Sequence, residues 1–272
     1  MPKRKPWYQT LFERDYYDYF YVGGPRGTMV RRGGDGAVVT ITPEQRARID
    51  DAQADFIVRA LELAEGARVL DLCCGWGRHA VRFAQRGHRV TGLDLSAYHL
   101  RLAKQAARDA GVQVELVRAD MREIPRGRRF DAVVNCFTSF GYFETEEDDQ
   151  RVLDGVARSL KPGGRFFIDT MNHDSLMRVF RESDCTKRPG GALSLELRSY
   201  DVHTGRISVD WIFVEPDGRR RTAFHSLRLY TFTEFAALLA KAGLRVVRTW
   251  GNFDGTEFSM HSPRMIVLAE KG

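Results

Sequence analysis

The stretch Val69-Leu70-Asp71-Leu72-Cys73-Cys74-Gly75-Trp76-Gly77-Arg78 decides the fold of this chain. An apolar run ends on a carboxylate and then turns through two glycines that are one residue apart. A helical pattern follows at once, and a second apolar run, residues 88–93, ends on Asp94. Glycines let backbone amides approach a bound ligand closely, and a carboxylate at the second strand end can accept hydrogen bonds from both hydroxyls of a ribose. The pattern therefore predicts a nucleoside site.

Two cofactors fit a glycine loop of this kind. Residues 75–80 match the G-x-G-x-x-G/A spacing of a nicotinamide dinucleotide site. Asp71 argues against a dinucleotide, because its carboxylate would lie close to a doubly charged pyrophosphate. S-adenosylmethionine has no phosphate and carries a sulfonium and an ammonium, which a carboxylate attracts. Unit charges about 4 Å apart interact by roughly 1 to 4 kcal/mol, so the sign of this charge favours the methyl donor, with the nicotinamide cofactor as the alternative.

The later strands add two further contacts to the predicted site. Residues 112–117 and 130–135 are predicted as the third and fourth strands, and a helix stop at 160–164 precedes a fifth strand at 165–169. Asp120 follows the third strand, where it can accept from an adenine amino group while Met121 covers a ring face. Asn135 ends the fourth strand. Side chains at the carboxyl ends of such strands meet at the ligand site of a doubly wound sheet.

With these motifs the chain resembles a class I S-adenosylmethionine-dependent methyltransferase of the bacterial small-molecule type. The resemblance covers roughly residues 43–270 and rests on LDLCCGWGRHA, VTGLDLS, ADM, FDAVVNCFTSFGYF, LKPGGRFFIDT and KAGLRVVRTWGNFDG. It implies an α/β fold: a seven-stranded, mainly parallel, doubly wound Rossmann-like sheet that ends in an antiparallel hairpin. Cys73 replaces the usual glycine of the first motif, a small residue with which the loop should still form. The Asn/Asp-Pro-Pro-Tyr signature of enzymes that methylate DNA and protein amino groups is absent after Asn135.

The cofactor-binding residues assigned in this way are Asp71, Cys73, Gly75, Gly77, Arg78, Asp94, Leu95, Asp120, Met121 and Asn135, with Tyr21 folding over the cofactor from the N-terminal lead. Arg78 is the candidate partner of the cofactor's carboxylate.

Outside the sheet motifs, two segments break the alternation of strand and helix. Residues 1–42 form an aromatic-rich lid segment with helical spacing at Trp7, Leu11, Phe12 and Asp15-Tyr16, and residues 43–272 form the methyltransferase domain. Within that domain, strands predicted at 193–200, 206–214 and 220–230 make an antiparallel β insertion, residues 192–230. Thr42 is predicted to cap a helix that runs toward Gly66, and Thr233 to cap a later one. The lid segment and the insertion are predicted to form the acceptor site.

Composition limits the partners of the chain. Its 272 residues carry a formal net charge of +6, but the arginines are dispersed over 31–32, 126–129 and 219–221 without interleaved aromatics, so no nucleic-acid partner is expected. The four cysteines lack metal-ligand spacing, and no metal is expected. No apolar run approaches the length of a membrane span, and no signal core follows the basic N-terminus. We therefore expect a cytoplasmic monomer or homodimer.

Methyl transfer from a sulfonium needs alignment more than acid-base chemistry, so catalytic residues are the least specific prediction. Tyr142 and Tyr230 are the preferred candidates for a general base, with His79, His225 and His261 behind them. The predicted function is S-adenosylmethionine-dependent transfer of a methyl group to an N or O atom of a small molecule. The alternatives are an RNA or protein methyltransferase, a nicotinamide-dependent dehydrogenase and a non-catalytic cofactor-binding protein.

Overall fold

The structure, a computed structural model, describes residues 6–12, 21–22, 28–32, 38–127, 129–188 and 190–272. The chain divides into two compact units. Unit 1 consists of residues 1–49 and 177–229, and unit 2 consists of residues 50–176 and 230–272. The candidate cofactor residues lie in unit 2, with the exception of Tyr21.

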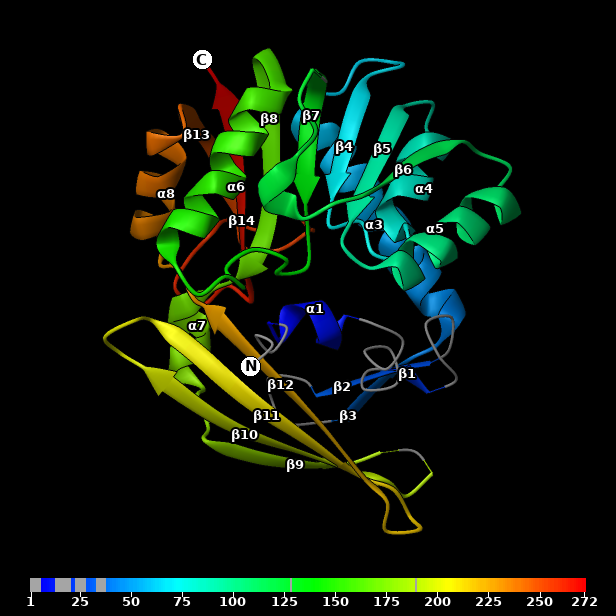
Figure 1. The fold of residues 1–272 in the computed structure, drawn as a ribbon, viewed down its shortest axis with the longest axis vertical. Helices are drawn as coiled ribbons and strands as arrows, with labels where there is room; N and C mark the ends of the chain where they lie inside the picture. Colours follow the sequence, from blue (N-terminus) through cyan, green and yellow to red (C-terminus); the bar gives the residue numbers. More distant parts are fainter. Residues whose placement is uncertain (1–5, 13–20, 23–27, 33–37, 128, 189) are drawn as a thin grey trace, which may run out of the picture. The chain divides into compact units, whose positions relative to one another are not determined.

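Unit 2 is built on a seven-stranded sheet (Figure 1). Its strands, in order across the sheet, are β13 (Leu244–Trp250), β14 (Arg264–Lys271), β8 (Leu160–Met171), β7 (Phe130–Asn135), β4 (Arg68–Leu72), β5 (Arg89–Asp94) and β6 (Val114–Arg118). The pairs from β8 across to β6 are parallel, and β14 is antiparallel to both of its neighbours. The predicted fold class, including the closing antiparallel strand, is confirmed. The strand order reverses direction at β4, and ligands bind at such a switch point in doubly wound sheets.

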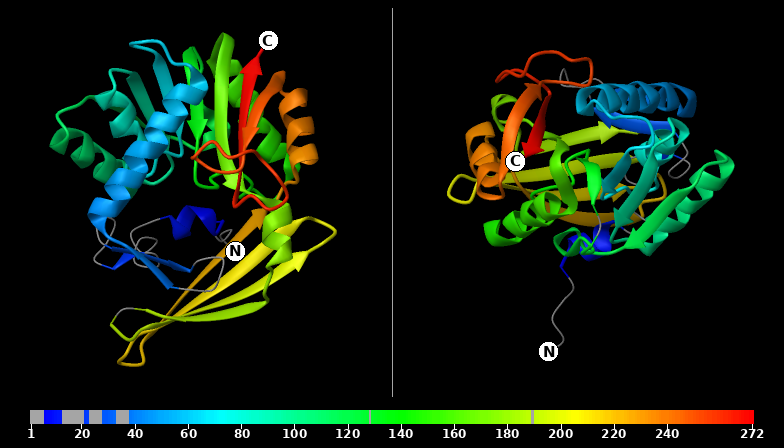
Figure 2. Two further views of the ribbon diagram at one scale, coloured as in Figure 1. Left: turned by 180° about the vertical axis from the view of Figure 1, so that it is seen from behind. Right: turned by 90° about the horizontal axis from the view of Figure 1, so that it is seen from above.

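Helices cover both faces of this sheet. In Figure 1, α6 (Glu146–Ser159) lies in front of the sheet and contacts α8 (Phe232–Lys241). Seen from behind in Figure 2, α3 (Pro43–Leu61) crosses the opposite face. Ion pairs join α3 to α4 (Arg78–Gln85) and its C-cap, since Arg82 on α4 and the C-cap Arg86 meet Asp51 and Asp55 on α3 at 2.8 and 2.7 Å. The α5 helix (Ala97–Asp109) packs against α4 and β6, and the short η1 (Met121–Glu123) packs against α6.

Side chains from both faces of the sheet are excluded from solvent. Phe83, Phe130, Phe166, Phe167 and Phe235 are the largest fully buried side chains. The strands β4 and β7 and residues 166–168 of β8 are mainly apolar because they are covered on both faces. Burial of this kind makes the carboxyl ends of the strands a rigid platform for the site.

The helix caps test the predicted boundaries. At Thr42 the prediction is confirmed, because its hydroxyl accepts the N–H of Gln45 while its own N–H donates to the Gln45 side chain. The prediction that Thr233 caps the later helix is wrong. Thr231 is the cap, with Glu234 as its reciprocal partner, so that Phe232 begins α8. The turn predicted at 160–164 is part of a strand instead, because β8 already begins at Leu160. The pairing of β7 with β8 shifts in register between Phe130 and Ala132.

Unit 1 contains a four-stranded antiparallel sheet with the order β12-β11-β10-β9. Its strands are β9 (Ser183–Lys187), β10 (Leu193–Asp201), β11 (Arg206–Val214) and β12 (Arg220–Arg228). Three of them match the predicted insertion, but β9 begins before residue 192. The sequence did not indicate β9 because Ser183-Asp184-Cys185-Thr186-Lys187 lacks apolar alternation.

The N-terminal part of unit 1 differs from the predicted helix. Only α1 (Tyr8–Leu11) is helical among the described residues of the lead, and it packs on β12. A three-stranded antiparallel sheet follows, with β1 (Tyr21–Val22), β2 (Thr28–Arg32) and β3 (Val38–Ile41). Residues 13–20, on which the helical prediction also drew, lie outside the described residues. The short α7 (His173–Arg178) follows β8. Among the described helices, none has the length and apolarity that a bilayer crossing requires.

Candidate functional site

The loop between β4 and α4 has the left-handed backbone that its glycines predict. Cys73, Gly75 and Gly77 have φ values of 63°, 54° and 81°. A side chain at Gly77 would also be obstructed, since a Cβ there would lie 3.0 Å from the Cβ of Ala103 on α5. The N–H of Cys74 donates to the carbonyl of Leu93 at 3.0 Å, which fastens the loop to the neighbouring strand β5. The loop is thus held close to α5 and β5.

Asp94 connects this loop to the end of β5. Its two carboxylate oxygens accept the N–H of Gly75 at 2.8 Å and the N–H of Ser96 at 2.9 Å. Ser96 in turn caps α5, and the His99 ring lies 3.7 Å from the same carboxylate. A carboxylate offers about four lone-pair positions, so Asp94 retains acceptor capacity after these two bonds. The predicted contact with a ribose remains a prediction, but the residue also orders the loop, which the sequence did not indicate.

Asp71 lies at the end of β4 and is 3% exposed. Burial raises the pKa of its carboxyl from the usual 3.8 to about 7, against the opposing charge of Arg78 and a hydrogen bond from the Ala80 backbone. The negative charge of Asp94 raises the pKa further. A buried carboxyl that is costly to ionise gains from a cationic ligand, and this is the charge complementarity predicted for a sulfonium.

The ends of β4, β6 and β7 bring other predicted residues together. The Sγ atom of Cys73 lies 3.5 Å from Sδ of Met121, and Asn135 donates to the carbonyl of Leu72 at 2.9 Å. Burial raises the pKa of the Cys73 thiol well above its usual value, so the thiol stays neutral. Leu95 is half-buried between β5 and α5.

Asp120 is less available than predicted. Its carboxylate accepts the backbone N–H of Arg122 at 2.9 Å and two bonds from the Arg122 guanidinium at 3.0 and 2.8 Å. Burial raises the pKa of Asp120, but these bonds and the arginine charge outweigh burial and lower it overall. Its contact with an adenine amino group stays a prediction and would have to use the lone pairs left over.

Arg78 begins α4 and is held on two sides. It forms an ion pair with Asp50 of α3 at 3.0 Å, and its guanidinium carbon lies 3.3 Å above the ring centroid of Phe137. The His79 ring stacks on Phe137 at 5.6 Å. Burial lowers the pKa of His79 well below its usual value, so the imidazole is neutral. Sequence reasoning missed Asp50, because no motif connects a residue of α3 with the glycine loop.

The two preferred catalytic candidates differ in their surroundings. Tyr230 is buried, and its hydroxyl donates to Asp149 on α6 at 2.8 Å. Tyr142 is half-buried in the segment after β7. His225 lies in unit 1 beside Trp211, and burial lowers its pKa to about 4. For Tyr21, the structure describes the backbone in β1 but not the side chain, so its predicted contact lies outside the described residues.

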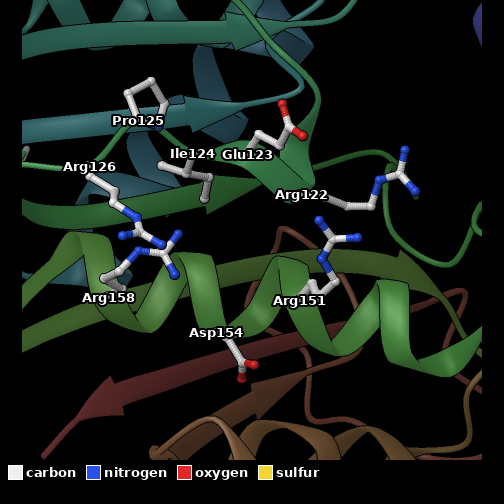
Figure 3. A pocket seen from close by; sticks show the side chains of 8 residues that line it. All are labelled: Arg122, Glu123, Ile124, Pro125, Arg126, Arg151, Asp154 and Arg158. Carbon is white, nitrogen blue, oxygen red and sulfur yellow. The ribbon is translucent and has the colours of Figure 1, made fainter.

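A groove of about 440 Å³ lies between η1 and α6, lined by Arg122, Glu123, Ile124, Pro125, Arg126, Arg151, Asp154 and Arg158 (Figure 3). Its arginines are largely compensated. Arg122 and Arg151 both pair with Asp148, at 2.8 and 3.0 Å, and Arg122 also binds Asp120. Asp154 and Glu123 add two further acidic groups to the lining. The groove is therefore a charge-balanced surface and differs from the strand-end site.

The residues at the strand ends fit S-adenosylmethionine. The Oδ1 atom of Asn135 is buried and has no hydrogen-bond partner among the described residues, so it offers an acceptor at this position. Asp71 offers a buried carboxyl whose ionised form a cationic ligand would stabilise, and Asp94 offers an acceptor beside the glycine loop. Within the described part of the chain, no group of three or more His, Cys, Asp or Glu side chains is arranged to hold a metal ion.

Comparisons with known proteins agree with this geometry. The family profile described as a methyltransferase domain matches residues 69–164, the span from β4 into β8. The chain is 32% identical over 215 residues to the putative methyltransferase YqeM of Bacillus subtilis (strain 168), covering 77% of this chain and 86% of that protein. It is 29% identical over 238 residues to dTDP-3-amino-3,4,6-trideoxy-alpha-D-glucopyranose N,N-dimethyltransferase of Streptomyces venezuelae, covering 85% and 90%.

Among solved structures, the CcbJ methyltransferase from Streptomyces caelestis superimposes with a TM-score of 0.76 at 21% identity. The match covers 95% of this chain and 96% of that one, and at this identity it bears on the fold alone. It extends over both units, whereas the family profile covers only the central part of unit 2.

Proposed function

This chain belongs to the class I S-adenosylmethionine-dependent methyltransferases, and on that premise we propose that it transfers a methyl group to a nitrogen or oxygen atom of a small-molecule acceptor. Its cofactor is S-adenosylmethionine, so the nicotinamide alternative is set aside. The observation that carries the proposal is the end of β4, where the buried carboxyl of Asp71 lies beside a glycine loop that Asp94 holds through the N–H of Gly75. The choice of a small-molecule acceptor is supported by the relative that is named for dimethylating an amino sugar.

When bound, S-adenosylmethionine supplies a methyl group on a sulfonium, which is an excellent leaving group for in-line displacement. The role of the chain's own residues would be to bind the cofactor and to orient it toward the acceptor. Asp94 holds Gly75 and would accept from the ribose, Asp71 would stabilise the positive charge, and Asn135 would accept through its buried Oδ1. On transfer the sulfonium would leave as a neutral thioether, and the acceptor would release a proton. Alignment of this kind can lower the activation free energy by about 7 to 11 kcal/mol.

The acceptor's proton need not be removed by a strong base. An amine attacks once it is neutral, whereas a hydroxyl usually needs a base. We propose Tyr142 and Tyr230 as candidates for that task. The Tyr230 hydroxyl donates to the buried carboxylate of Asp149 at 2.8 Å, a bond that it would have to give up in order to act as a base. Selection of the acceptor is assigned to residues 1–42 and 192–230, which remains a prediction, as does the cytoplasmic location.

Turnover with pooled acceptors tests the proposal. The purified chain is incubated with S-adenosylmethionine labelled in the methyl group and with separate pools of amino sugars, other small amines, phenols, RNA and unfolded protein. Mass spectrometry reads out S-adenosylhomocysteine and the labelled acceptor. We expect label in an amine or hydroxyl pool and loss of turnover in the Asp94→Ala variant. Label confined to RNA or protein would overturn the small-molecule proposal, and cofactor binding without any transfer would indicate a binding protein.

A further inference from the structure

The segment that follows β7 has an unusual backbone. Phe137 and Thr138 are consecutive non-glycine residues with φ values of 61° and 58°. Left-handed backbone is uncommon outside glycine, and for a β-branched residue such as Thr138 it is a genuine outlier. Conformations of this kind persist only where the surrounding structure determines them, and they gather at functional sites. The cause must therefore be sought in the contacts of these two residues.

Asp169 and Arg264 supply those contacts. Asp169, on β8, is 0% exposed, and its Oδ2 accepts the N–H of Phe137 at 2.9 Å while its carbonyl accepts the N–H of Thr138 at 3.0 Å. Arg264, on β14, donates to the Oδ1 of Asp169 at 2.6 Å and to the hydroxyl of Thr138 at 3.0 Å. One ion pair thus binds both strained residues through three hydrogen bonds, and a fourth joins Arg264 to Asp169.

The strained segment presents one aromatic ring to the cofactor loop. Phe137 is 43% exposed although its backbone is fixed. Its face lies 3.3 Å from the guanidinium of Arg78, and its ring stacks on His79 and on Phe253. Arg78 and His79 are the first two residues of α4, directly after the glycine loop. A change in the backbone of Phe137 would therefore reach the cofactor loop through two direct side-chain contacts.

We infer that Asp169 and Arg264 are positioning residues for the cofactor site, because they hold Phe137 and Thr138 in the strained backbone that sets the Phe137 ring against Arg78 and His79. The inference rests on the proposed function, since it assigns the ion pair to that same site. A buried ion pair is weak evidence for stability in itself, because desolvation of the two charges offsets their attraction. The pair of Asp169 and Arg264 instead holds Phe137 and Thr138 in one backbone geometry.

The experiment removes single contacts without emptying the core. Arg264→Lys keeps a positive charge near Asp169 but cannot donate to both partners with one planar group. Thr138→Val removes only the hydroxyl, and Thr138→Ser restores it. Arg245→Lys is the matched control, because Arg245 lies on the adjacent strand β13, is 73% exposed on its side chain and pairs only loosely with Glu270 at 3.5 Å.

Two readouts separate positioning from a purely structural role. Amide hydrogen exchange at Phe137 and Thr138 measures whether the loop is held, and calorimetry with S-adenosylhomocysteine measures the cofactor site. We expect Arg264→Lys and Thr138→Val each to speed exchange and to weaken binding about tenfold, the size of one lost hydrogen bond. The double variant should be weakened by much less than the product of the two, because both act on one network. Thr138→Ser and Arg245→Lys should bind within about twofold of the unaltered chain.

The outcomes distinguish this inference from the proposed function. Faster exchange with unaltered affinity would mean that the ion pair only stabilises the loop, and it would overturn the inference alone. Unaltered exchange would overturn it as well. Absence of binding by the unaltered chain would overturn the proposed function together with the inference. Should Arg264→Lys fail to fold, the comparison of Thr138→Val with Thr138→Ser decides the question by the same two readouts.

Discussion

Replacing Asp71 with asparagine isolates the electrostatics of the candidate site. Asparagine has nearly the same shape as aspartate but does not titrate in the range of interest. The folded chain raises the pKa of Asp71 from 3.8 to about 7, chiefly through burial, with Arg78 and the Ala80 backbone opposing and Asp94 adding to the rise. In the unfolded chain the same carboxyl returns to its ordinary pKa of about 3.9. The difference between the two states makes folding depend on pH at this position.

The sign and the size follow from linkage. Between about pH 4 and pH 7 the folded chain holds a proton that the unfolded chain has released, so the free energy of unfolding falls as the pH rises through this window. The Asp71 contribution is complete below about pH 4 and is lost above about pH 7. A difference of roughly three pKa units corresponds to about 4 kcal/mol at 1.36 kcal/mol per unit. Asp71→Asn should abolish this part of the pH dependence, and the variant should be the more stable chain at pH 8.

The assay is urea unfolding of both chains at half-unit steps from pH 4 to pH 8. The variant's free energy of unfolding should equal that of the unaltered chain near pH 4 and exceed it by several kcal/mol at pH 8. The affinity for S-adenosylmethionine should fall in the variant, because the positive charge of the ligand attracts the ionised carboxylate. This attraction is worth roughly 1 to 4 kcal/mol at about 4 Å. The variant should therefore lose more affinity for S-adenosylmethionine than for the uncharged sulfur of S-adenosylhomocysteine. Parallel unfolding profiles for the two chains would refute the reasoning.

Three further outcomes are expected. Gly77→Ala should cost more stability than Gly87→Ala. Both glycines have positive φ, 81° and 83°, and share a backbone penalty of about 1 to 2 kcal/mol, but only at Gly77 would a Cβ lie 3.0 Å from Ala103. Equal losses of stability in thermal unfolding would contradict this expectation. Tyr230→Phe should lower the free energy of unfolding by about 1.5 to 3 kcal/mol, because it removes a donor from buried Asp149; an unchanged urea midpoint would contradict it. Single-stranded RNA should bind more weakly than about 1 µM at physiological salt, and tighter binding in a filter assay would favour the RNA alternative.

The sheet was predictable from the sequence because its strands are buried on both faces. Residues 130–135 are apolar enough to be assigned to β7 without error, and the hairpin near the C-terminus followed from the family resemblance. The strand β9 and the β1–β3 sheet were not predicted, since β9 is polar and β1, β2 and β3 are only two to five residues long, too short for a periodicity that separates them from loops. Thr231 and not Thr233 caps α8 because Glu234 lies three residues after Thr231, the spacing of a reciprocal capping pair.

The candidate site was predictable only as far as its motifs extend. Asp71, Asp94 and Asn135 were located because each ends a strand, and such strand ends meet at one edge of the sheet. Asp169 also ends an apolar run, so the sequence carries a signal for its position at a strand end. Asp50 and Arg264 had none, because their partners lie 28 and 95 residues away in the chain and only the fold brings them together.

The most direct test of the account is a calorimetric titration of the unaltered chain and of Asp94→Ala with S-adenosylmethionine and, separately, with a nicotinamide dinucleotide. The account predicts saturable binding of S-adenosylmethionine by the unaltered chain and none of the dinucleotide. In Asp94→Ala it predicts a loss of about 1.5 to 3 kcal/mol for each charge-assisted hydrogen bond removed. Binding of the dinucleotide in place of S-adenosylmethionine, or an unchanged affinity in Asp94→Ala, would contradict it.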